Sequence, residues 1–346
     1  MPRPLAITMG DPAGIGPEII AKAFRDAPAV LAGCVVVGDV ATLRRAARLI
    51  AGTDALVLPL AQLDKVADWQ AAPPRCIPVL QTCELPALAA FGQVSALAGK
   101  AAADCIVWAA RAALSGEIAA MVTAPIHKEA LALAGAGFAR FPGHTELLQA
   151  EAAAYAGKAV ADMPVRMMLA NDELKTVLVS IHLSLRDAIS SVTFDNVLQT
   201  LQIAHASVRG VAGGAPRIGV AGLNPHAGEG GLFGREEIDT IAPAIAAARA
   251  QGLNVSGPFA PDTVFMRARA KSGHAGEFDV VVAMYHDQGL IPVKYLGVEQ
   301  GVNVTLGLPM VRTSPDHGTA FDIAGKGSAD ASSLIAAIRM ARQLSA

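Results

Sequence analysis

Short runs rich in valine and isoleucine alternate with longer alanine-rich segments along this chain of 346 residues. The short runs have the length and β-branched content of strands, and the alanine-rich segments have the apolar spacing of helices. This alternation predicts an α/β fold with mostly parallel strands. The expected strands are Pro4–Met9, Cys34–Val37, Met121–Ala124, Thr176–Ile181, Ile218–Gly222, Val280–Tyr285 and Val302–Leu306. The expected helices include Gly16–Ala27, Ala96–Ser115, Arg235–Gln251 and Ser332–Ser345.

The length of the chain predicts two lobes, since one domain usually spans roughly 100–200 residues. Hydrophobic residues make up 53% of the sequence and charged residues only 17%. So apolar a chain has enough surface to bury and folds into a globular protein. The proline-rich segment Ala51–Ala90 is expected to be a loop-like connection.

Charge and cysteine content exclude several classes of protein. With a net charge of -2 and no basic stripe, the chain has nothing to attract nucleic acid or an anionic membrane. Its four cysteines form no C-x-x-C pair, so we expect reduced, buried thiols. The chain starts with too short an apolar run for a signal peptide and has no stretch of about 18 apolar residues. These features predict a cytoplasmic protein that binds small molecules or other subunits.

Histidines follow three of the expected strands, and ligands of open α/β sheets bind beyond the carboxyl ends of strands. These residues are His182, His226 and His286. Three neutral imidazoles suit Zn²⁺, Co²⁺ or a similar ion and leave positions open for substrate oxygens. Asp287 and Glu229 are acids that would complete or orient such a site. The alternative is that the histidines are hydrogen-bonded loop residues.

Three further segments carry candidate binding groups. The glycine-rich segment Gly10–Glu18 is either a ligand-binding loop at a helix N-terminus or a tight structural turn, and the dinucleotide fingerprint G-x-G-x-x-G is absent from the sequence. His144 and Thr145 offer hydrogen-bonding groups, with helix capping as the alternative role of Thr145. Lys294, Asn303 and Arg312 lie in an otherwise apolar region and suggest an anionic ligand, with surface salt bridges as the alternative for the cations.

Seven segments, in order and over nearly the whole chain, resemble the 4-hydroxythreonine-4-phosphate dehydrogenase family. They are GDPAGIGPE, TAPIHKEAL, FPGHTE, GLNPHAGEGGLFGREE, GPFAPDT, YHDQGLIPVKY and GVNVTLGLPMVRTSPDHGTAFDIAGKG. The resemblance implies a two-lobed α/β/α fold similar to isocitrate and isopropylmalate dehydrogenases. It also implies a homodimer whose active site lies between the lobes and is completed by the neighbouring subunit.

The resemblance also implies roles for individual residues. It assigns one divalent metal ion, zinc, magnesium or cobalt, to His182, His226 and His286. It assigns substrate contacts to His144, Thr145, Lys294, Asn303 and Arg312. Residues 1–121 and 300–346 are expected to form the first lobe, and residues 122–299 the second, with the metal ligands and the expected dimer contacts. NAD or NADP is the implied cofactor, and no residue is assigned to its binding.

The function that follows from the resemblance is a metal-dependent dehydrogenase. It would oxidise 4-hydroxythreonine 4-phosphate to a 3-oxo acid that loses CO₂, on the route to pyridoxal phosphate. Asp287 and metal-bound water are the candidates for the proton acceptor. The alternatives within the resemblance are paralogues that oxidise 4-phospho-threonate, 4-phospho-erythronate or a carboxylated cyclohexadiene diol. His127 in TAPIHKEAL, together with FPGHTE, favours the pyridoxal-pathway enzyme. Outside it, the residues also suit a metal-dependent hydrolase or a non-catalytic phosphate-binding protein.

Overall fold

A computed structural model describes residues 3–52, 56–212, 214–271 and 274–345. The chain divides into two compact units, the first made of Met1–Pro164 and Leu308–Ser345 and the second of Val165–Gly307. The first unit is discontinuous in sequence. Its boundaries with the second unit lie at 164/165 and 307/308, because the helices that follow residue 121 pack against the helices of the first unit. No helix of the described residues is long and apolar enough to cross a membrane.

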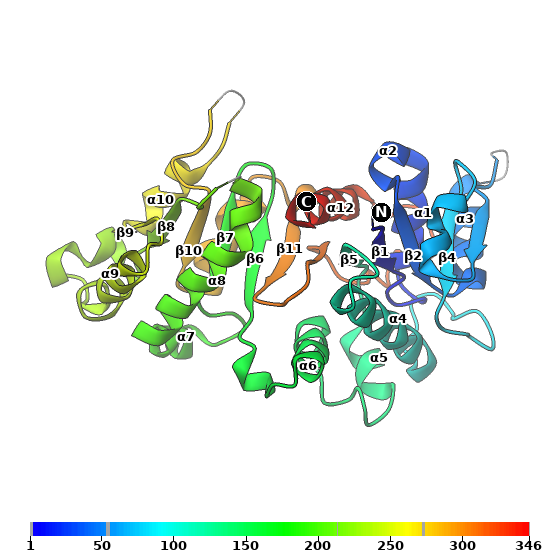
Figure 1. The fold of residues 1–346 in the computed structure, drawn as a ribbon, viewed down its shortest axis with the longest axis horizontal. Coiled ribbons are helices and arrows are strands. Elements are labelled where there is room, and N and C mark those ends of the chain that lie inside the picture. The colour runs from blue at the N-terminus through cyan, green and yellow to red at the C-terminus, as the bar shows by residue number, and fades with distance from the viewer. Residues whose placement is uncertain (1–2, 53–55, 213, 272–273, 346) are drawn as a thin grey trace. The chain divides into compact units, whose positions relative to one another are not determined.

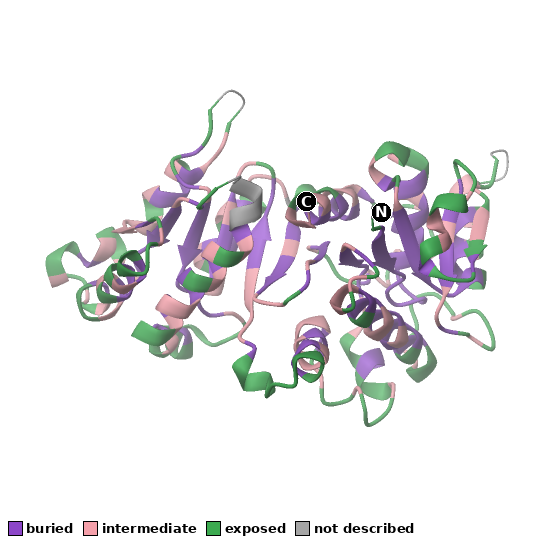
Figure 2. Ribbon diagram, in the orientation of Figure 1, coloured by how far each residue is buried: buried purple, intermediate pink, exposed green. Residues whose placement is uncertain are grey.

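The first unit is built on a parallel sheet with the strand order β3-β4-β2-β1-β5-β12. Its inner strands are fully buried, as Figure 2 shows, and this explains their continuous apolar sequences. Each strand that the alternation predicted in this unit is present, although its ends shift by a residue or two. The strands are β1 (Leu5–Thr8), β2 (Cys34–Gly38), β3 (Leu60–Leu63), β4 (Ile77–Gln81), β5 (Ala120–Thr123) and β12 (Arg312–Pro315).

Helices cover both faces of this sheet. α1 and α12 pack together, and α12 lies against β12 and β5, while α4 contacts β1, β2 and β5 (Figure 1). The long helix α4 begins where the Ser95 side chain accepts a hydrogen bond from the backbone N–H of Ala98. The helices of the unit are α1 (Gly16–Asp26), α2 (Pro28–Leu31), α3 (Val40–Ala51), η1 (Val66–Ala71), α4 (Ala96–Leu114), α5 (Lys128–Leu133), α6 (His144–Ala156), η2 (Val160–Asp162) and α12 (Ser332–Ser345).

Part of the proline-rich segment forms regular structure, which corrects the expectation of a loop-like connection for Ala51–Ala90. β3 and β4 run parallel within it and extend the sheet from β2. Pro78 lies inside β4, a position that the sequence analysis took as evidence against a strand. Burial of the alternating Ile77 and Val79 side chains outweighs the breaker signal.

The second unit has a mixed sheet with the strand order β11-β6-β7-β10-β8-β9. The β7, β10, β8 and β9 strands are parallel, whereas β6 is antiparallel to both of its neighbours. β6 was not among the expected strands, and it forms a hairpin with β7 through a short turn. The strands are β6 (Arg166–Ala170), β7 (Lys175–Leu178), β8 (Ile218–Ala221), β9 (Val255–Phe259), β10 (Val280–Ala283) and β11 (Val302–Leu306).

Helices α8 and α9 cover one face of this second sheet, and α10 and α11 pack against the other (Figure 1). The predicted helix Arg235–Gln251 is divided into a π-helical turn, Glu237–Ile241, and the α-helix α9. Its first turn is therefore irregular where it meets the loop after β8. The helices are α7 (Leu185–Ser191), α8 (Phe194–Ala212), η3 (Pro225–Gly231), η4 (Glu237–Ile241), α9 (Ala242–Ala250), α10 (Pro261–Ala268), α11 (His286–Tyr295) and η5 (Val298–Gln300).

Candidate active site

The second unit places its three candidate histidines after three neighbouring parallel strands. His182 follows β7, His286 follows β10, and His226 follows β8. These strands lie in the order β7-β10-β8 and point the same way, so all three histidines come to the same edge of the sheet. This is the edge at which open α/β sheets bind ligands.

His182 and His286 lie together at this edge. Their ring centroids are 5.7 Å apart, and the rings are tilted by 43°. Two imidazole rings at this separation suit a shared ion, whose nitrogen ligands lie roughly 2 Å from the metal. The segments that carry the two histidines are linked, because the Ser180 hydroxyl donates a hydrogen bond to the carbonyl of Met284, 2.9 Å away.

The Asp287 carboxylate contacts the ring of His286. Its Oδ1 lies 2.7 Å from Nδ1 of the imidazole, and both side chains are substantially exposed. A carboxylate at this nitrogen fixes the tautomer of a histidine and leaves the other ring nitrogen, Nε2, to face a metal ion. The structure thus gives Asp287 a contact that suits an orienting role, and its role as proton acceptor stays a prediction.

His226 lies on a separate loop, whose backbone is left-handed from His226 to Gly230. The φ angles of His226, Ala227 and Glu229 are 52°, 54° and 43°. Each non-glycine residue in this conformation costs roughly 1–2 kcal/mol. Among the residues that the structure describes, no three His, Cys, Asp or Glu side chains are close enough to hold one ion. The described chain thus brings two imidazoles together, those of His182 and His286, and metal binding by the three histidines stays a prediction.

A buried carboxylate holds the start of this loop. Glu237 is only 3% exposed, and its Oε1 accepts hydrogen bonds from the backbone N–H groups of Leu223 and Asn224, both at 2.7 Å. Its Oε2 accepts a third from the Asn224 side chain at 3.0 Å. Glu237 is the last residue of the segment GLFGREE, and nothing in the sequence pattern indicated a role for it.

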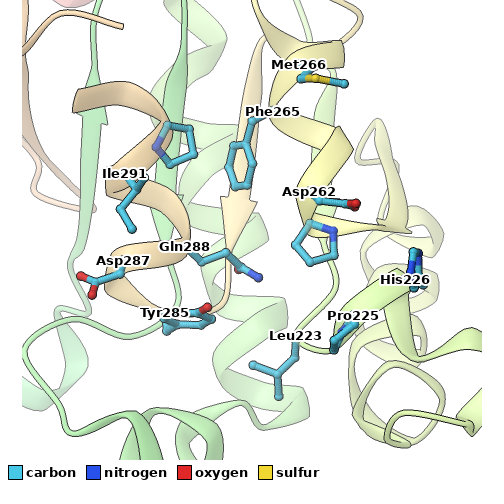
Figure 3. A pocket seen from close by; sticks show the side chains of 12 residues that line it. Leu223, Pro225, His226, Asp262, Phe265, Met266, Tyr285, Asp287, Gln288 and Ile291 are labelled. Atoms are coloured by element: carbon cyan, nitrogen blue, oxygen red, sulfur yellow. The ribbon is translucent and has the colours of Figure 1, made fainter. Parts of the chain in front are cut away.

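A pocket of about 660 Å³ opens beside His226, entirely within the second unit. Figure 3 shows Phe265 and Met266 of α10 on one side and Ile291 of α11 on another, with Asp287 and His226 at the margins. The Gln288 side chain links two segments that border the pocket. It accepts a hydrogen bond from the N–H of Met284 and donates one to the carbonyl of Gly222, both at 2.7 Å. The pocket is therefore mainly apolar, with acidic and imidazole groups at its edge.

Two predicted substrate residues also belong to the second unit. Lys294 is exposed in the last turn of α11, the helix that begins with His286. Asn303 is half-buried on β11, where it pairs with Leu169 of β6. Both residues are thus fixed on regular elements, which gives their polar groups defined positions.

The other predicted substrate residues lie in the first unit, around the buried side chain of Arg312. Arg312 is 4% exposed, and its Nε and Nη2 donate to the Thr123 hydroxyl at 3.0 and 2.7 Å. Burial lowers the pKa of its guanidinium to about 10, so it remains a cation at neutral pH. Burial, with a smaller contribution from Arg312, holds the pKa of His144 well below its usual value and keeps that ring neutral. A buried cation beside a neutral imidazole suits an anionic substrate group.

The local structure at His144 and Thr145 settles one alternative. The helix α6 begins at His144, and its N-cap is Gly143 rather than Thr145. No side chain caps this helix. The Nε2 atom of His144 is buried without a hydrogen-bond partner, which is a costly arrangement unless a ligand supplies one.

The arrangement of strands and helices defines the class of protein. The fold is similar to that of a β-decarboxylating dehydrogenase from Thermococcus kodakarensis, with a TM-score of 0.50 over 98% of this chain and 82% of that one, at 14% identity. Such a distant likeness shows the fold alone. It agrees with the predicted two-lobed α/β class of isocitrate and isopropylmalate dehydrogenases.

The particular family follows from closer comparisons. The family described as "Pyridoxal phosphate biosynthetic protein PdxA" matches residues 31–341. A 4-hydroxythreonine-4-phosphate dehydrogenase of Beijerinckia indica subsp. indica is 53% identical, over 99% of this chain and 95% of that one. The chain belongs to the PdxA family, and the predictions of this family and of an oxidoreductase are confirmed.

Two other relatives show how far this similarity extends. A D-threonate 4-phosphate dehydrogenase of Salmonella typhimurium is 45% identical over 99% of both chains. The crystal structure of a 4-hydroxythreonine-4-phosphate dehydrogenase from Klebsiella pneumoniae gives a TM-score of 0.84 at 43% identity, over 99% of this chain and 100% of that one. Relatives named for two different substrates thus match the whole chain at similar levels.

Proposed function

We propose that this enzyme oxidises 4-hydroxythreonine 4-phosphate with NAD or NADP, with the help of one divalent metal ion. The 3-oxo acid formed would lose CO₂ to give 3-amino-2-oxopropyl phosphate in pyridoxal phosphate biosynthesis, in the cytoplasm. The observation that carries the proposal is the pairing of His182 and His286 at the carboxyl edge of the second sheet. The 53% identical relative named for this activity supports the choice of substrate.

His182 and His286 would hold the ion, which is zinc, magnesium or cobalt in this proposal, and His226 would be the third ligand. Such an ion supplies Lewis-acid chemistry at the substrate hydroxyl, and the nicotinamide accepts the hydride. Within the chain, Asp287 holds the His286 ring by its Nδ1 atom. It is also our candidate for the group that accepts the hydroxyl proton.

The substrate's anionic groups would be held by the cations of the predicted site. Arg312 offers a buried guanidinium whose orientation is fixed by Thr123. Lys294 supplies a point charge on α11, and Asn303 supplies an amide on β11. His144 and Thr145, at the start of α6, add neutral hydrogen-bonding groups. Together these residues would select a small phosphorylated hydroxy acid over an uncharged alcohol.

We further propose that the protein works as a homodimer with its active site at the subunit interface. Support comes from the position of His226, which lies on the loop after β8, apart from the paired rings of His182 and His286. A second copy of the chain would bring its own His226 to complete the three ligands. Sedimentation of the purified protein together with metal titration tests this arrangement, and a monomer that binds the ion at full affinity contradicts it.

A second candidate substrate is D-threonate 4-phosphate, which the name of the 45% identical Salmonella relative favours. It shares the phosphate, the carboxylate and the secondary hydroxyl, so the same cations and the same metal would serve. It differs from 4-hydroxythreonine 4-phosphate in carrying a hydroxyl where that compound carries an amine. Both assignments require the same reaction type.

The test is a panel of phosphorylated hydroxy acids assayed with each cofactor and several metals. Reduced-nicotinamide absorbance that appears with 4-hydroxythreonine 4-phosphate at the highest kcat/KM supports the proposal. A higher value for D-threonate 4-phosphate moves the assignment to the second candidate. If metal-loaded protein forms no reduced nicotinamide with any compound, the result contradicts a dehydrogenase and favours the metal-dependent hydrolase instead.

A further inference from the structure

The loop that carries His226 adopts a conformation that its sequence alone does not favour. Three of the residues from His226 to Gly230 are not glycine, yet all five have left-handed backbone angles. An exposed loop would relax from this conformation unless neighbouring groups held it. His226 itself is exposed, so burial of its ring does not hold the loop in place.

Glu237 is the group that holds the start of this loop. Its single Oε1 atom accepts two consecutive backbone N–H groups, those of Leu223 and Asn224. These residues lie three and two positions before His226, so the carboxylate fixes the direction in which the chain leaves β8. Its second oxygen binds the Asn224 side chain, and that residue's carbonyl accepts the N–H of Ala227 at 3.1 Å.

The loop also closes around the carboxylate sterically. A Cβ atom on Gly228 would lie 2.7 Å from Oε2 of Glu237, and one on Gly222 would lie 3.0 Å from its Oε1. The chain therefore passes the carboxylate at both ends of the segment that carries His226. The Glu237 side chain thus contacts the chain both before and after His226.

We infer that Glu237 is a positioning residue that presents His226 to the metal ion. The inference rests on the proposed function, because it requires that His226 bind metal. Glu237 reaches the ion only through the backbone of Leu223 and Asn224, and it is not itself a ligand. The reach of its carboxylate, more than its charge, is the property that the geometry demands, since two of its three hydrogen bonds go to neutral backbone groups.

The test compares two substitutions that separate reach from charge. Glu237→Asp keeps the charge but is one methylene shorter. Glu237→Gln keeps the reach and one oxygen for the two backbone donors, while its amide nitrogen replaces the oxygen that accepts from the Asn224 side chain. Metal-free protein of each is titrated with Co²⁺, with the dissociation constant measured by calorimetry and the ligand set by visible absorption. Glu236→Ala is the matched control, because the neighbouring Glu236 accepts a hydrogen bond from the Asn224 side chain, whereas the backbone N–H groups of Leu223 and Asn224 donate to Glu237.

Glu237→Asp is expected to raise the dissociation constant roughly 10- to 100-fold, the usual effect of losing a group that orients a metal ligand. Glu236→Ala should stay within about threefold of the wild type. Glu237→Gln, which loses one of the three hydrogen bonds, should raise the dissociation constant less than Glu237→Asp does and should keep the wild-type Co²⁺ spectrum. Wild-type affinity in Glu237→Asp, alongside weak binding in His226→Ala, overturns this inference and leaves the proposed function intact. Unchanged binding in His226→Ala overturns both.

Discussion

Two glycines of the His226 loop allow its conformational strain to be separated from its contact with Glu237. Gly228 and Gly230 both have left-handed backbones, with φ angles of 80° and 67°. A Cβ atom on Gly230 meets nothing within 4 Å, whereas one on Gly228 would lie 2.7 Å from Oε2 of Glu237 and 3.0 Å from the carbonyl of Gly234. Alanine at either position therefore adds the same backbone strain, but only alanine at position 228 also clashes with neighbouring atoms.

The size of the two effects can be worked out from these contacts. Gly230→Ala should lower the free energy of unfolding by roughly 1–2 kcal/mol, the cost of a left-handed alanine. Gly228→Ala carries the same cost and also displaces the carboxylate. Losing a hydrogen bond to a charged group costs roughly 1.5–3 kcal/mol. We therefore expect a total of about 2.5–5 kcal/mol, a substantial part of the roughly 5–15 kcal/mol that stabilises a folded protein.

The assay is urea denaturation of both variants, followed by circular dichroism, together with hydrogen exchange of the segment 222–234. Gly228→Ala should unfold at the lower urea concentration, and the amides of Leu223 and Asn224 should lose protection in this variant but keep it in Gly230→Ala. Equal midpoints and equal protection in the two variants would refute the reasoning. They would mean that the carboxylate of Glu237 yields to the added methyl group without cost.

Three further substitutions test the site residues. His226→Ala should abolish metal-dependent turnover and leave the circular dichroism spectrum unchanged, because its ring is exposed; full activity in chelated buffer contradicts the ligand role. Arg312→Ala should raise KM for the phosphorylated substrate roughly 10- to 100-fold, as expected for a charged hydrogen bond, and initial rates with an unchanged KM would count against it. Because the folded pKa of His144 lies below 6.5, only the unfolded chain takes up its proton, and stability should fall as pH drops through about 6.5. His144→Gln should reduce that fall in urea midpoints.

The sequence predicted the fold well where burial alone determines it. β11 and α12 have the predicted bounds, Val302–Leu306 and Ser332–Ser345, because apolar runs and helical spacing are local properties. Five strands, β3, β4, β6, β9 and β12, were missed. β3 is short and only partly buried, and prolines interrupt the segment that holds β3 and β4, so their pairing depends on the neighbouring β2 strand. Long-range pairing of this kind leaves little trace in a single sequence.

The candidate site was predicted to the level of the sheet edge and no further. Strand direction brings His182, His226 and His286 to one edge, and the sequence pattern shows that each follows a strand. Which rings meet depends on the path of each loop after its strand. The loop after β8 has a left-handed backbone from His226 to Gly230, a conformation that non-glycine residues rarely adopt. The position of this loop could therefore not be derived from the periodicity of the sequence.

The distribution of strain in the second unit bears on how a metal site would assemble. His182 and His286 are fixed by backbone contacts of β7 and β10, and their pairing needs no unusual backbone angle. The start of the His226 loop is held by three hydrogen bonds from Leu223 and Asn224 to one buried carboxylate. These bonds oppose the conformational strain of the left-handed residues in the loop. These contacts fix the backbone of the His226 loop through groups of the chain itself, so Glu237 provides organisation that a metal ion does not have to induce. A ligand organised in advance loses less conformational entropy on binding, and this is the physical reason to expect metal affinity to depend on Glu237.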